Sequence, residues 1–589
     1  MKNAEIAALF DKMADALELG GENRFRINSY RKAARAIGDL TEDIGLLDQQ
    51  NRLKDIPGVG QGHAEKISEY LRTGRMHRYD EVMSGIGEET VALMHISGLG
   101  PKTVAMLHKQ LGIVDVSGLE KAIREDRLTG LKGLAGKKIE NILRGIEFYK
   151  TSLERIPLGV AYPVVTQIVE MLRETPGVAA VQPAGSLRRM KETVGDIDIL
   201  AAGTAGVKGQ EIIKSFVNMP GVTQVLAAGG TKGSVRLEEG FHEGLQVDLR
   251  VVEACSFGSA LQYFTGSKEH NVRLREIAKK NGMKISEYGI FKGDRKLGGR
   301  KEEDIYKALG MEWIPPEMRE DRGEIAAALQ GRLPRLVKAD DIKGDLHVHS
   351  RWSDGVSTLE EIAGCARAQG YKYCVVSDHT KSTRIANGLD ERRLLKQIKE
   401  IDSLNKKLKG FRLLKASECD ILSDGSMDMP DEILERLDIV LAAIHAGFRQ
   451  PREKTTERVL AAIRNPYVNV IVHPTGRLIS MREGYELDMD RVMEACAETG
   501  TALEINSHYD RLDLNDINAR KAKQMGVKVA VSTDSHYLEQ LWQMELGLGV
   551  ARRGWLEAGD IINTYPLEKL LRFCRAKRKK KGKKPAARR

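Results

Sequence analysis

The sequence predicts a multidomain chain with helices first, an α+β region next and a barrel of alternating strands and helices last. Three observations predict it. Glycine turns between amphipathic runs recur before residue 150, strands carrying carboxylates follow, and short apolar runs ending in histidine or acid occupy the region after residue 340. Such βα alternation is typical of a parallel sheet or barrel. At 589 residues and 41% hydrophobic content, the chain can form several domains with separate cores.

The N-terminal region repeats a glycine-centred turn ahead of an amphipathic run. Leu53 to Gly60 leads into Ala64 to Leu71, and a similar unit recurs at Ile96 to Lys102. Glycine permits the tight turn, and the following helix N-terminus directs N–H groups at an anion. The pattern resembles the helix-hairpin-helix motif, which grips DNA phosphates without reading sequence. Its DNA contacts would come from Gly58, Gly60, Gly98 and Gly100.

A third copy of this turn is weaker. It lies at 131–136, where Ala135 stands in place of the second glycine. A plain glycine helix cap therefore explains this copy better than a DNA contact.

The central region places two carboxylates after a Gly-Ser turn. Asp196 and Asp198 are two apart, so on a strand both side chains face one way and can hold two divalent cations. Asp248, in the alternating run 245–252, indicates a strand that could pair beside the first. Three acids around two Mg²⁺ ions would activate a hydroxyl and steady a leaving pyrophosphate. In the turn, the Ser186 hydroxyl and nearby amides can bind a triphosphate.

Further residues indicate a nucleotide site. Arg155 and Arg189 offer planar, permanently charged partners for phosphates. Gly266 permits close backbone approach to a ligand. Asn271 and Arg275 lie four apart and so share one face of a helix.

Together these motifs closely resemble the family X DNA polymerases, typified by DNA polymerase beta, from residue 1 to about 315. The resemblance implies a palm and a thumb, with Asp196, Asp198 and Asp248 as the catalytic metal-binding carboxylates. It implies that the nucleotide-binding residues are Arg155, Gly185, Ser186, Arg189, Gly195, Tyr263, Phe264, Gly266, Asn271 and Arg275.

The same resemblance implies a deoxyribose phosphate lyase, since the N-terminal domain of polymerase beta relatives can act through a lysine Schiff base. It assigns that lysine to Lys66 and a residue of the 5′-phosphate pocket to Tyr30. Arg26 and Gly62 stand where animal enzymes have lysines, which weakens the expected basic cluster. The alternative is that Lys66 is an ordinary exposed helix lysine.

The C-terminal region gathers histidines at strand ends. Of 13 histidines, seven lie between His347 and His536. In a β/α barrel such strand ends meet at one face. Imidazole and carboxylate without thiolate suit Mn²⁺, Zn²⁺ or Fe²⁺, and nine ligands suffice for two or three ions. The predicted strands are 345–349, 371–379, 412–419, 438–445, 468–473, 501–506 and 528–534, and the candidate ligands are His347, His349, Asp354, His379, Glu418, His445, His473, Asp534 and His536.

This pattern resembles the PHP (polymerase and histidinol phosphatase) domain, which implies a distorted (β/α)7 barrel. Every ligand position that can be matched is filled, which favours an active phosphoesterase over an idle scaffold. His508 and Asn506 lie near the rim, and we interpret them as polar surface residues.

A family X polymerase followed by a PHP domain is the arrangement of bacterial and archaeal PolX enzymes. The resemblance implies a repair DNA polymerase that fills short gaps, with 3′-5′ exonuclease activity in the PHP domain. Its partners would be gapped or nicked DNA and deoxynucleoside triphosphates, its cofactors Mg²⁺ or Mn²⁺ in the palm and two or three Mn²⁺, Zn²⁺ or Fe²⁺ ions in the barrel. Abasic-site incision, a DNA-end-binding scaffold and a pyrophosphatase or nucleotide phosphatase remain alternatives.

Composition and motifs divide the chain. Pro315-Pro316 and the charged residues after them indicate a linker. The predicted parts are a gap-binding helical domain (1–80), a second helix-hairpin-helix domain (81–150), the palm (151–250), the thumb (251–315), the linker (316–340), the PHP domain (341–574) and a basic, disordered tail (575–589).

The net charge of +10, from 93 basic and 83 acidic residues, resides in that tail, since Arg575 to Arg589 contains ten Lys or Arg and no acid. The tail would add a salt-sensitive attraction to phosphate, or only aid solubility. The chain has no apolar run of membrane length, no signal peptide and no C-x-x-C pair among its six cysteines. These features predict a cytoplasmic protein without membrane contact, and a monomer is expected.

Overall fold

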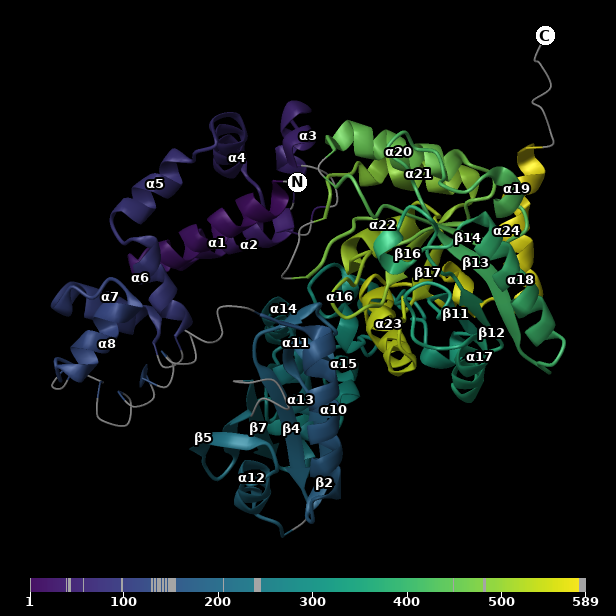
Figure 1. The fold of residues 1–589 in the computed structure, drawn as a ribbon. Helices are drawn as coiled ribbons and strands as arrows, with labels where there is room; N and C mark the ends of the chain where they lie inside the picture. The colour runs from purple at the N-terminus through teal and green to yellow at the C-terminus, as the bar shows by residue number, and fades with distance from the viewer. Residues whose placement is uncertain are drawn as a thin grey trace. The chain divides into compact units, whose positions relative to one another are not determined.

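The computed structural model describes residues 2–581 except 39, 41–43, 57, 97–98, 129–130, 132–133, 135–138, 140–141, 144–145, 147–154, 205, 238–244, 449 and 480–483. The chain divides into two compact units, Met1–Glu154 and Arg155–Arg589 (Figure 1). Within the described ranges, none of the helices combines the length and the apolar character that a membrane span needs.

The first unit is helical and is built around two main hydrophobic cores. Phe10 and Ile67 are fully buried in one core, and Leu107 is fully buried in the other. Gly60 and Gly100 have extended backbone conformations, and each immediately precedes a helix. Both glycine turns therefore lead into helices, as the sequence predicts. The helices are α1 (Asn3–Leu19), α2 (Arg24–Gly38), α3 (Ile44–Gln49), α4 (Gln61–Thr73), α5 (His77–Ser84), α6 (Glu88–Ala92), α7 (Pro101–Leu111) and α8 (Val116–Arg124).

A five-stranded sheet forms the palm region of the second unit. Its order is β2-β4-β7-β6-β5, with β4 and β7 parallel and the other neighbours antiparallel. The predicted strands that carry Asp198 and Asp248 are therefore neighbours. Helix α10 (Leu158–Glu174) packs on β2, and α12 (Gly209–Val217) packs on β5, β6 and β7. The strands are β2 (Val178–Pro183), β4 (Ile197–Gly203), β5 (Val222–Ala228), β6 (Lys232–Leu237) and β7 (Gln246–Val252).

A smaller α+β region follows, and it corrects the predicted linker. Met318 and Ile325, within the expected linker 316–340, are buried in one core with Tyr306. The charged Glu324 is fully buried there against the imidazole of His270 at 2.6 Å. Some of the charges that suggested a linker, such as Glu324 and Arg319, are thus paired inside the fold. The elements are α13 (Phe257–Thr265), α14 (Lys268–Lys280), β8 (Lys284–Ser286), β9 (Gly289–Lys292), β10 (Arg295–Gly298), α15 (Glu302–Ala308) and α16 (Glu324–Leu329).

Seven parallel strands, hydrogen-bonded in chain order, form the C-terminal barrel, and all seven predicted strands are present. The barrel closes between β17 and β11, where the Asp534 N–H donates to the carbonyl of His347 and the His349 N–H to that of Ser535, both at 2.9 Å. The strands are β11 (Gly344–Val348), β12 (Tyr373–Val376), β13 (Arg412–Asp420), β14 (Ile439–Ala443), β15 (Val470–Ile471), β16 (Ala502–Asn506) and β17 (Val529–Ser532).

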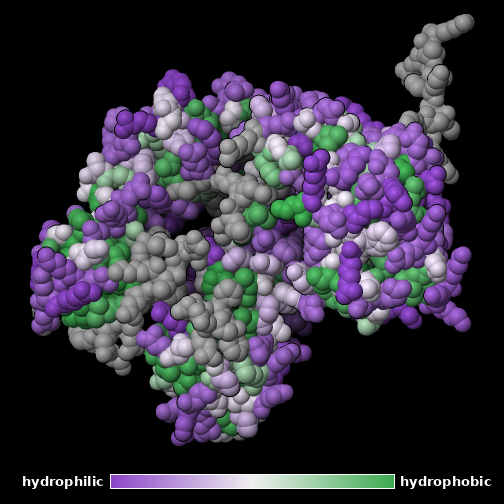
Figure 2. Space-filling model, in the orientation of Figure 1, coloured by the Kyte–Doolittle hydropathy of each residue, from purple (hydrophilic) through white to green (hydrophobic). Residues whose placement is uncertain are grey.

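Helices surround the barrel, and the face seen in Figure 2 is mostly hydrophilic over them. Alternation of strand and helix around a closed set of strands is the predicted β/α architecture. The helices are α17 (Leu359–Ala368), α18 (Glu391–Asn405), α19 (Asp431–Leu434), α20 (Arg452–Arg464), α21 (Met489–Thr499), α22 (Asp516–Gln524), α23 (Met544–Arg553) and α24 (Leu567–Lys581).

Helix α24 corrects the predicted tail. Disorder is expected from residue 575, but 575–581 continue the helix. Cys574 is buried against the barrel, and Lys577, only 7% exposed, donates from Nζ to the Thr501 hydroxyl at 2.8 Å. Buried apolar residues just before 575, Leu570, Leu571 and Cys574, hold the helix on the barrel, and Lys577 continues this contact through its hydrogen bonds. Residues 582–589 lie outside the described ranges.

Candidate functional site

Three carboxylates meet in the palm where β4 and β7 run in parallel. Asp198 pairs in register with Asp248, and Asp196 directly precedes β4. Burial, Asp248 and Asp196 raise the pKa of Asp198 to about 6, and burial and Asp248 also raise the pKa of Asp196. Carboxylates held this close favour a cation between them. Their oxygen-only donor set suits Mg²⁺ or Mn²⁺.

Lys232, which sequence reasoning missed, supplies a positive charge at this site. Its Nζ lies 2.7 Å from Oδ2 of Asp248, and the Ser234 hydroxyl and Gln246 amide donate to Oδ1 at 2.5 and 2.9 Å. A small cavity beside the carboxylates is lined by Lys232 and Phe264 among others. The sequence feature that could have pointed to Lys232 is its place at the start of a strand after a Gly-Gly turn. The sequence does not reveal, however, that β6 lies next to β7.

The predicted Gly-Ser turn lies against the carboxylates. Gly185 has φ +60°, and a Cβ there would lie 2.7 Å from Oδ2 of Asp198, so glycine is required. Ser186 is half-buried in the short helix α11 (Gly185–Arg188). Gly195 is close to the guanidinium of Arg155, 3.4 Å from a Cβ built on it. These positions bring the turn, the carboxylates and one predicted arginine together.

The two predicted phosphate-binding arginines are held by other protein groups. Arg155 donates from Nε to the Thr193 hydroxyl at 2.9 Å, and burial lowers its pKa although Asp196 opposes this. Arg189 donates from Nε to Glu320 at 3.0 Å and from Nη1 to the carbonyl of Thr265 at 2.6 Å. Among the described residues these bonds use two nitrogens of Arg189, which leaves Nη2 for a phosphate.

The remaining nucleotide-site candidates lie at the end of α13 and on α14. The rings of Tyr263 and Phe264 meet edge to face at 5.2 Å. A Cβ on Gly266 would lie 2.2 Å from the amide nitrogen of Asn271, so this contact requires glycine. Arg275 lies one turn further on α14 and is exposed.

In the first unit, the predicted lyase residues lie on α2 and α4. Lys66 donates from Nζ to the carbonyl of Gly62 at 2.6 Å, and burial and the nearby Arg78 lower its pKa. Tyr30 is buried, with its ring 4.7 Å from that of His63.

The predicted DNA-contacting glycines are only partly described. Gly58 has φ +88°, and a Cβ there would lie 2.9 Å from Cγ of Lys32, so the first turn requires glycine. Gly98 and most of the 131–136 turn lie outside the described residues.

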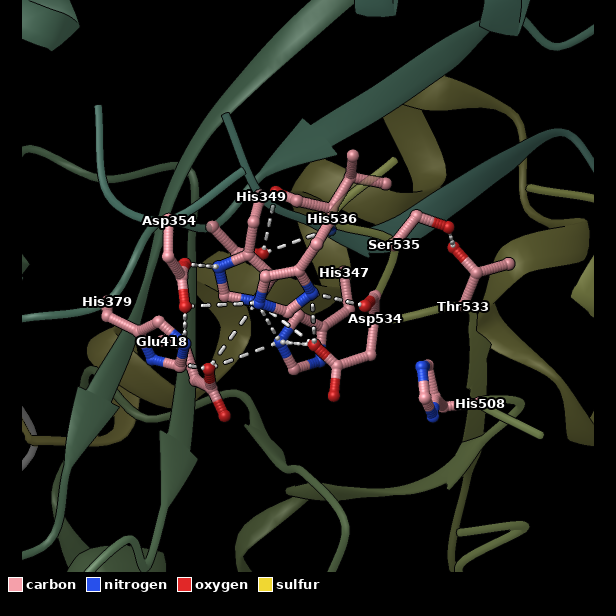
Figure 3. Close-up of polar contacts among 12 residues, drawn as sticks. His347, His349, Asp354, His379, Glu418, His508, Thr533, Asp534, Ser535 and His536 are labelled. Carbon is pink, nitrogen blue, oxygen red and sulfur yellow. Dashed lines mark hydrogen bonds and ion pairs between the residues drawn. The ribbon is translucent and has the colours of Figure 1, made fainter. Parts of the chain in front are cut away.

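The barrel brings all nine candidate ligands into one cluster. Figure 3 shows the part of it formed by His347, His349, Asp354, His379, Glu418, Asp534 and His536. Nε2 of His473 is 2.7 Å from Oε1 of Glu418, whose carboxylate also lies 2.9 Å from Nδ1 of His379 and 3.1 Å from Nε2 of His445. Apart from His473, the nine candidate ligands fall into three overlapping groups, and in each group one ligand atom per residue lies within 4.8 Å of the others. The groups are His349, Asp354, His379 and His536; His347, His349, Glu418 and Asp534; and His379, Glu418 and His445.

The electrostatics of this cluster fit metal ions. Nδ1 atoms of His349 and His473 are buried and lack a hydrogen-bond partner among the described residues. Burial lowers the pKa of His347, but neighbouring carboxylates, Asp534 first, outweigh it and raise that pKa well above the usual value. Burial, His536 and other imidazoles lower the pKa of His349 to about 3. The carboxylates thus favour a positive charge beside His347, and a bound cation would supply that charge in place of the imidazole proton. Imidazole and carboxylate together are a donor set for Mn²⁺, Zn²⁺ or Fe²⁺.

Two carboxylates that hold the ligands escaped sequence reasoning. Oε1 of Glu504 lies 2.9 Å from Nδ1 of His347, and Oε2 accepts the His473 N–H at 2.7 Å. Oδ1 of Asp420 lies 2.9 Å from Nδ1 of His445. Such partners fix the tautomer and ring orientation of ligating histidines. An acid inside an apolar strand, as in β16, was the signal that could have found Glu504.

Asn506 is not a surface residue, and that prediction is wrong. It is fully buried, and Nδ2 donates to Glu504 at 3.2 Å and to Asp534 at 3.0 Å. Strand β16 carries the amide into the interior, where it needs partners. His508 is half-buried beside Asp510 and lies apart from the ligand groups in Figure 3.

The palm and the barrel are joined by a buried ionic network. Nη1 of Arg553, on α23, donates to the carbonyl of Arg189 at 2.8 Å and to Glu320 at 2.9 Å. Nη2 of Arg553 lies 2.8 Å from Asp516 of α22. The pKa of Glu320 falls to about 2, because Arg553 and Arg189 outweigh the effect of burial. A barrel side chain therefore contacts both a nucleotide-site candidate and its carboxylate partner.

Three family models match the chain. A DNA polymerase beta thumb matches residues 260–320, a helix-hairpin-helix domain residues 1–76, and a SAM-like helix-hairpin-helix tandem residues 90–147. The predicted helix-hairpin-helix and thumb folds are confirmed by these matches.

Similar proteins cover both halves of the chain. DNA polymerase/3′-5′ exonuclease PolX of Bacillus subtilis (strain 168) is 37% identical over 578 residues, 98% of this chain and 100% of that protein. A probable phosphatase of Thermoanaerobacter sp. (strain X514) is 31% identical over 249 residues, 40% of this chain and 96% of that protein. DNA polymerase lambda of Rattus norvegicus is 27% identical over 346 residues, 54% of this chain and 56% of that protein.

Proposed function

The chain belongs to the PolX family of DNA polymerase/3′-5′ exonucleases, and from that premise we propose that its two candidate sites carry out opposite reactions on DNA. The palm site extends a 3′ end with deoxynucleoside triphosphates, and the barrel cluster hydrolyses such an end. The observation that carries this proposal is the presence of two separate candidate cation sites in the second unit, one with oxygen donors and one with mixed donors.

In the palm, Asp196, Asp198 and Asp248 would hold two divalent cations, which activate a primer hydroxyl and neutralise the leaving pyrophosphate when bound. The protein's own part is positioning. The amides and hydroxyl of the turn at Gly185 and Ser186 face the triphosphate, and Arg155 and Arg189 balance its charge. Tyr263, Phe264 and Gly266 border the sugar, while Asn271 and Arg275 reach the minor groove.

In the barrel, the nine ligands would hold two or three ions, which supply hydroxide and polarise a phosphodiester oxygen when bound. Glu504 orients His347, and Asp420 orients His445, through their Nδ1 atoms. Asp354 and His536 are the most exposed of the nine, with 32% and 26% of their side chains accessible. The scissile strand therefore approaches the cluster from their side.

A gapped duplex with a mismatched 3′ end tests the assignment. With Mg²⁺ or Mn²⁺ and all four triphosphates, we expect loss of the mismatched nucleotide followed by filling of the gap. Protein that binds this DNA but neither removes nor adds nucleotides would instead be an end-binding scaffold. Hydrolysis of free nucleotides without attack on DNA would instead indicate a nucleotide phosphatase.

A second activity, deoxyribose phosphate lyase, is favoured by the environment of Lys66. Its lowered pKa leaves more of the amine neutral, which is the form that makes a Schiff base. Borohydride should trap a covalent adduct with a 5′-deoxyribose phosphate substrate in the wild type and not in Lys66→Ala. An equal adduct in both proteins would remove Lys66 from this role.

A further inference from the structure

An exposed patch adjoins the barrel cluster on its open side. It consists of Arg351, Val356 and Tyr537, and we refer to it as the rim patch. The side chain of Arg351 is exposed, Val356 is 43% exposed and Tyr537 is 51% exposed. Apolar side chains this exposed, next to a cation and a candidate metal site, suggest a binding surface more than an ordinary loop.

The backbone fixes the rim patch directly against the candidate ligands. The Val356 N–H donates to the carbonyl of His536 at 3.0 Å, and Tyr537 is the next residue after His536. The Arg351 guanidinium in turn donates from Nε to the carbonyl of Val356. His536 lies 3.4 Å from the carboxylate of Asp354, so the patch borders the two most accessible ligands.

The loops that carry the rim patch are rigidly held. The side-chain oxygen of Gln540 accepts the N–H groups of both His536, at 2.8 Å, and Tyr537, at 3.2 Å. A Cβ on Gly355 would lie 2.5 Å from the backbone of His349, so the loop that carries Val356 lies tightly against the residue that follows β11. The aromatic ring is therefore presented from a fixed backbone, which reduces the ordering cost of binding.

The chemistry of the rim patch matches one nucleotide. An aromatic ring and a branched aliphatic side chain offer a stacking surface for a base, and an arginine suits its phosphate. We propose that the rim patch binds the base and phosphate of the unpaired terminal nucleotide of the DNA strand that the barrel hydrolyses. This inference rests on the proposed exonuclease function and assigns the residues that contact the terminal nucleotide.

The occupant must be unpaired for a physical reason. A base stacked inside a duplex has both faces covered, so reaching Tyr537 requires it to unstack and unpair, which costs free energy. A mismatched end is already partly free of that cost. The rim patch would thus select mispaired ends without any contact that reads sequence.

The test varies both the protein and the DNA. Wild type, Tyr537→Ala, Tyr537→Phe and Arg351→Gln are compared with Tyr467→Ala, which changes an aromatic residue located before β15, at the other end of the barrel. Each variant hydrolyses single-stranded oligonucleotides whose 3′ nucleotide has a base or lacks one. Stacking of one base is worth about 1–3 kcal/mol, so about a tenfold effect on KM is expected.

We expect wild type to show about a tenfold higher KM for the end that lacks a base. Tyr537→Ala should show that raised KM for both ends, with kcat within about twofold of wild type. Tyr537→Phe and Tyr467→Ala should behave as wild type. Arg351→Gln should raise KM for both ends and lower the salt slope of binding by about one.

A second readout separates this inference from the exonuclease proposal. Emission of 2-aminopurine at the 3′ terminus, measured on metal-free full-length protein, should change on binding to wild type and Tyr537→Phe but not to Tyr537→Ala. If Tyr537→Ala distinguishes the two ends as wild type does, the rim patch is not the subsite. If wild type changes the emission but hydrolyses no DNA with Mn²⁺, the exonuclease proposal fails while the subsite stands.

Discussion

The palm and the barrel would hold cations by different designs. In the palm, three carboxylates on adjoining strands repel one another, and Lys232 is the cation in contact with Asp248. In the barrel, the carboxylate of Glu418 is surrounded by imidazoles, and the Glu418 side chain is almost completely buried. Further carboxylates, such as Glu504 at Nδ1 of His347, orient the histidines.

This difference implies that the two sites would acquire their ions at different stages. The negative charge of the palm carboxylates is only partly balanced by protein groups, so we expect it to be balanced by cations that bind together with a triphosphate. Barrel imidazoles such as those of His349 and His473, whose buried Nδ1 atoms lack a hydrogen-bond partner among the described residues, would form a site that keeps its ions in the resting protein. The palm should therefore depend on ions during turnover, and the barrel should depend on them for stability as well.

The largest effects are expected from mutations that inactivate one site and spare the other. Asp198→Asn should lower nucleotide addition on the order of 10³-fold, because a cation ligand worth several kcal/mol is lost, and should leave 3′ hydrolysis intact. His347→Ala combined with His349→Ala should do the reverse. Both rates are measured on one primer-template, with circular dichroism as the control for folding. Loss of both reactions in either folded variant would contradict the two-site account.

A milder variant tests the carboxylates that orient the ligating histidines of the barrel. Glu504→Gln should lower nuclease activity about 10- to 100-fold, because His347 and the backbone of His473 lose their fixed partner, and should leave polymerase activity unchanged. Glu557→Gln is the matched control, since that carboxylate pairs with Lys523 and touches none of the nine ligands. Equal losses in the two variants would assign the effect to general destabilisation.

The buried network between palm and barrel gives a third test. Arg553→Met should raise the KM for triphosphates about tenfold, because Arg189 and Glu320 lose a charge-assisted donor, with little change in nuclease rate. Arg552→Met removes the neighbouring contact to Glu317 without reaching Glu320. If both variants raise KM equally, the interface acts as a whole and Arg553 has no special role.

The smallest expected effect is on stability. Addition of Mn²⁺ to chelator-treated protein, to about 100 times its Kd, should raise Tm by about 5 to 10 °C through the barrel. Asp198→Asn should keep most of this shift, and the His347→Ala, His349→Ala double variant should lose it. Differential scanning calorimetry measures it, and a shift that depends on Asp198 alone would reverse the comparison.

Much of the fold could be predicted, because it depends on local patterns. Short apolar runs, four of which end in histidine, predicted the seven strands. Because parallel strand ends necessarily meet at one face, the ligand cluster followed. Alternation around Asp198 and Asp248 predicted two strands, and the structure makes them neighbours.

What escaped prediction depends on contacts between distant residues. Glu320 lies 131 positions after Arg189, so their bond and its extension to Arg553 leave no local trace. The linker prediction was wrong because charge hid the apolar residues Met318 and Ile325. Likewise, the ten basic residues at the C-terminus gave no sign that Lys577 would be buried in hydrogen bonds to Val468 and Thr501 and that α24 would continue past residue 575.

Anomalous diffraction from crystals soaked in Mn²⁺, with and without a triphosphate, tests the central claim most directly. The account predicts peaks among His347, His349, Glu418 and Asp534 in both crystals, and peaks beside Asp196, Asp198 and Asp248 that strengthen with the triphosphate. Crystals without manganese at either location would contradict it.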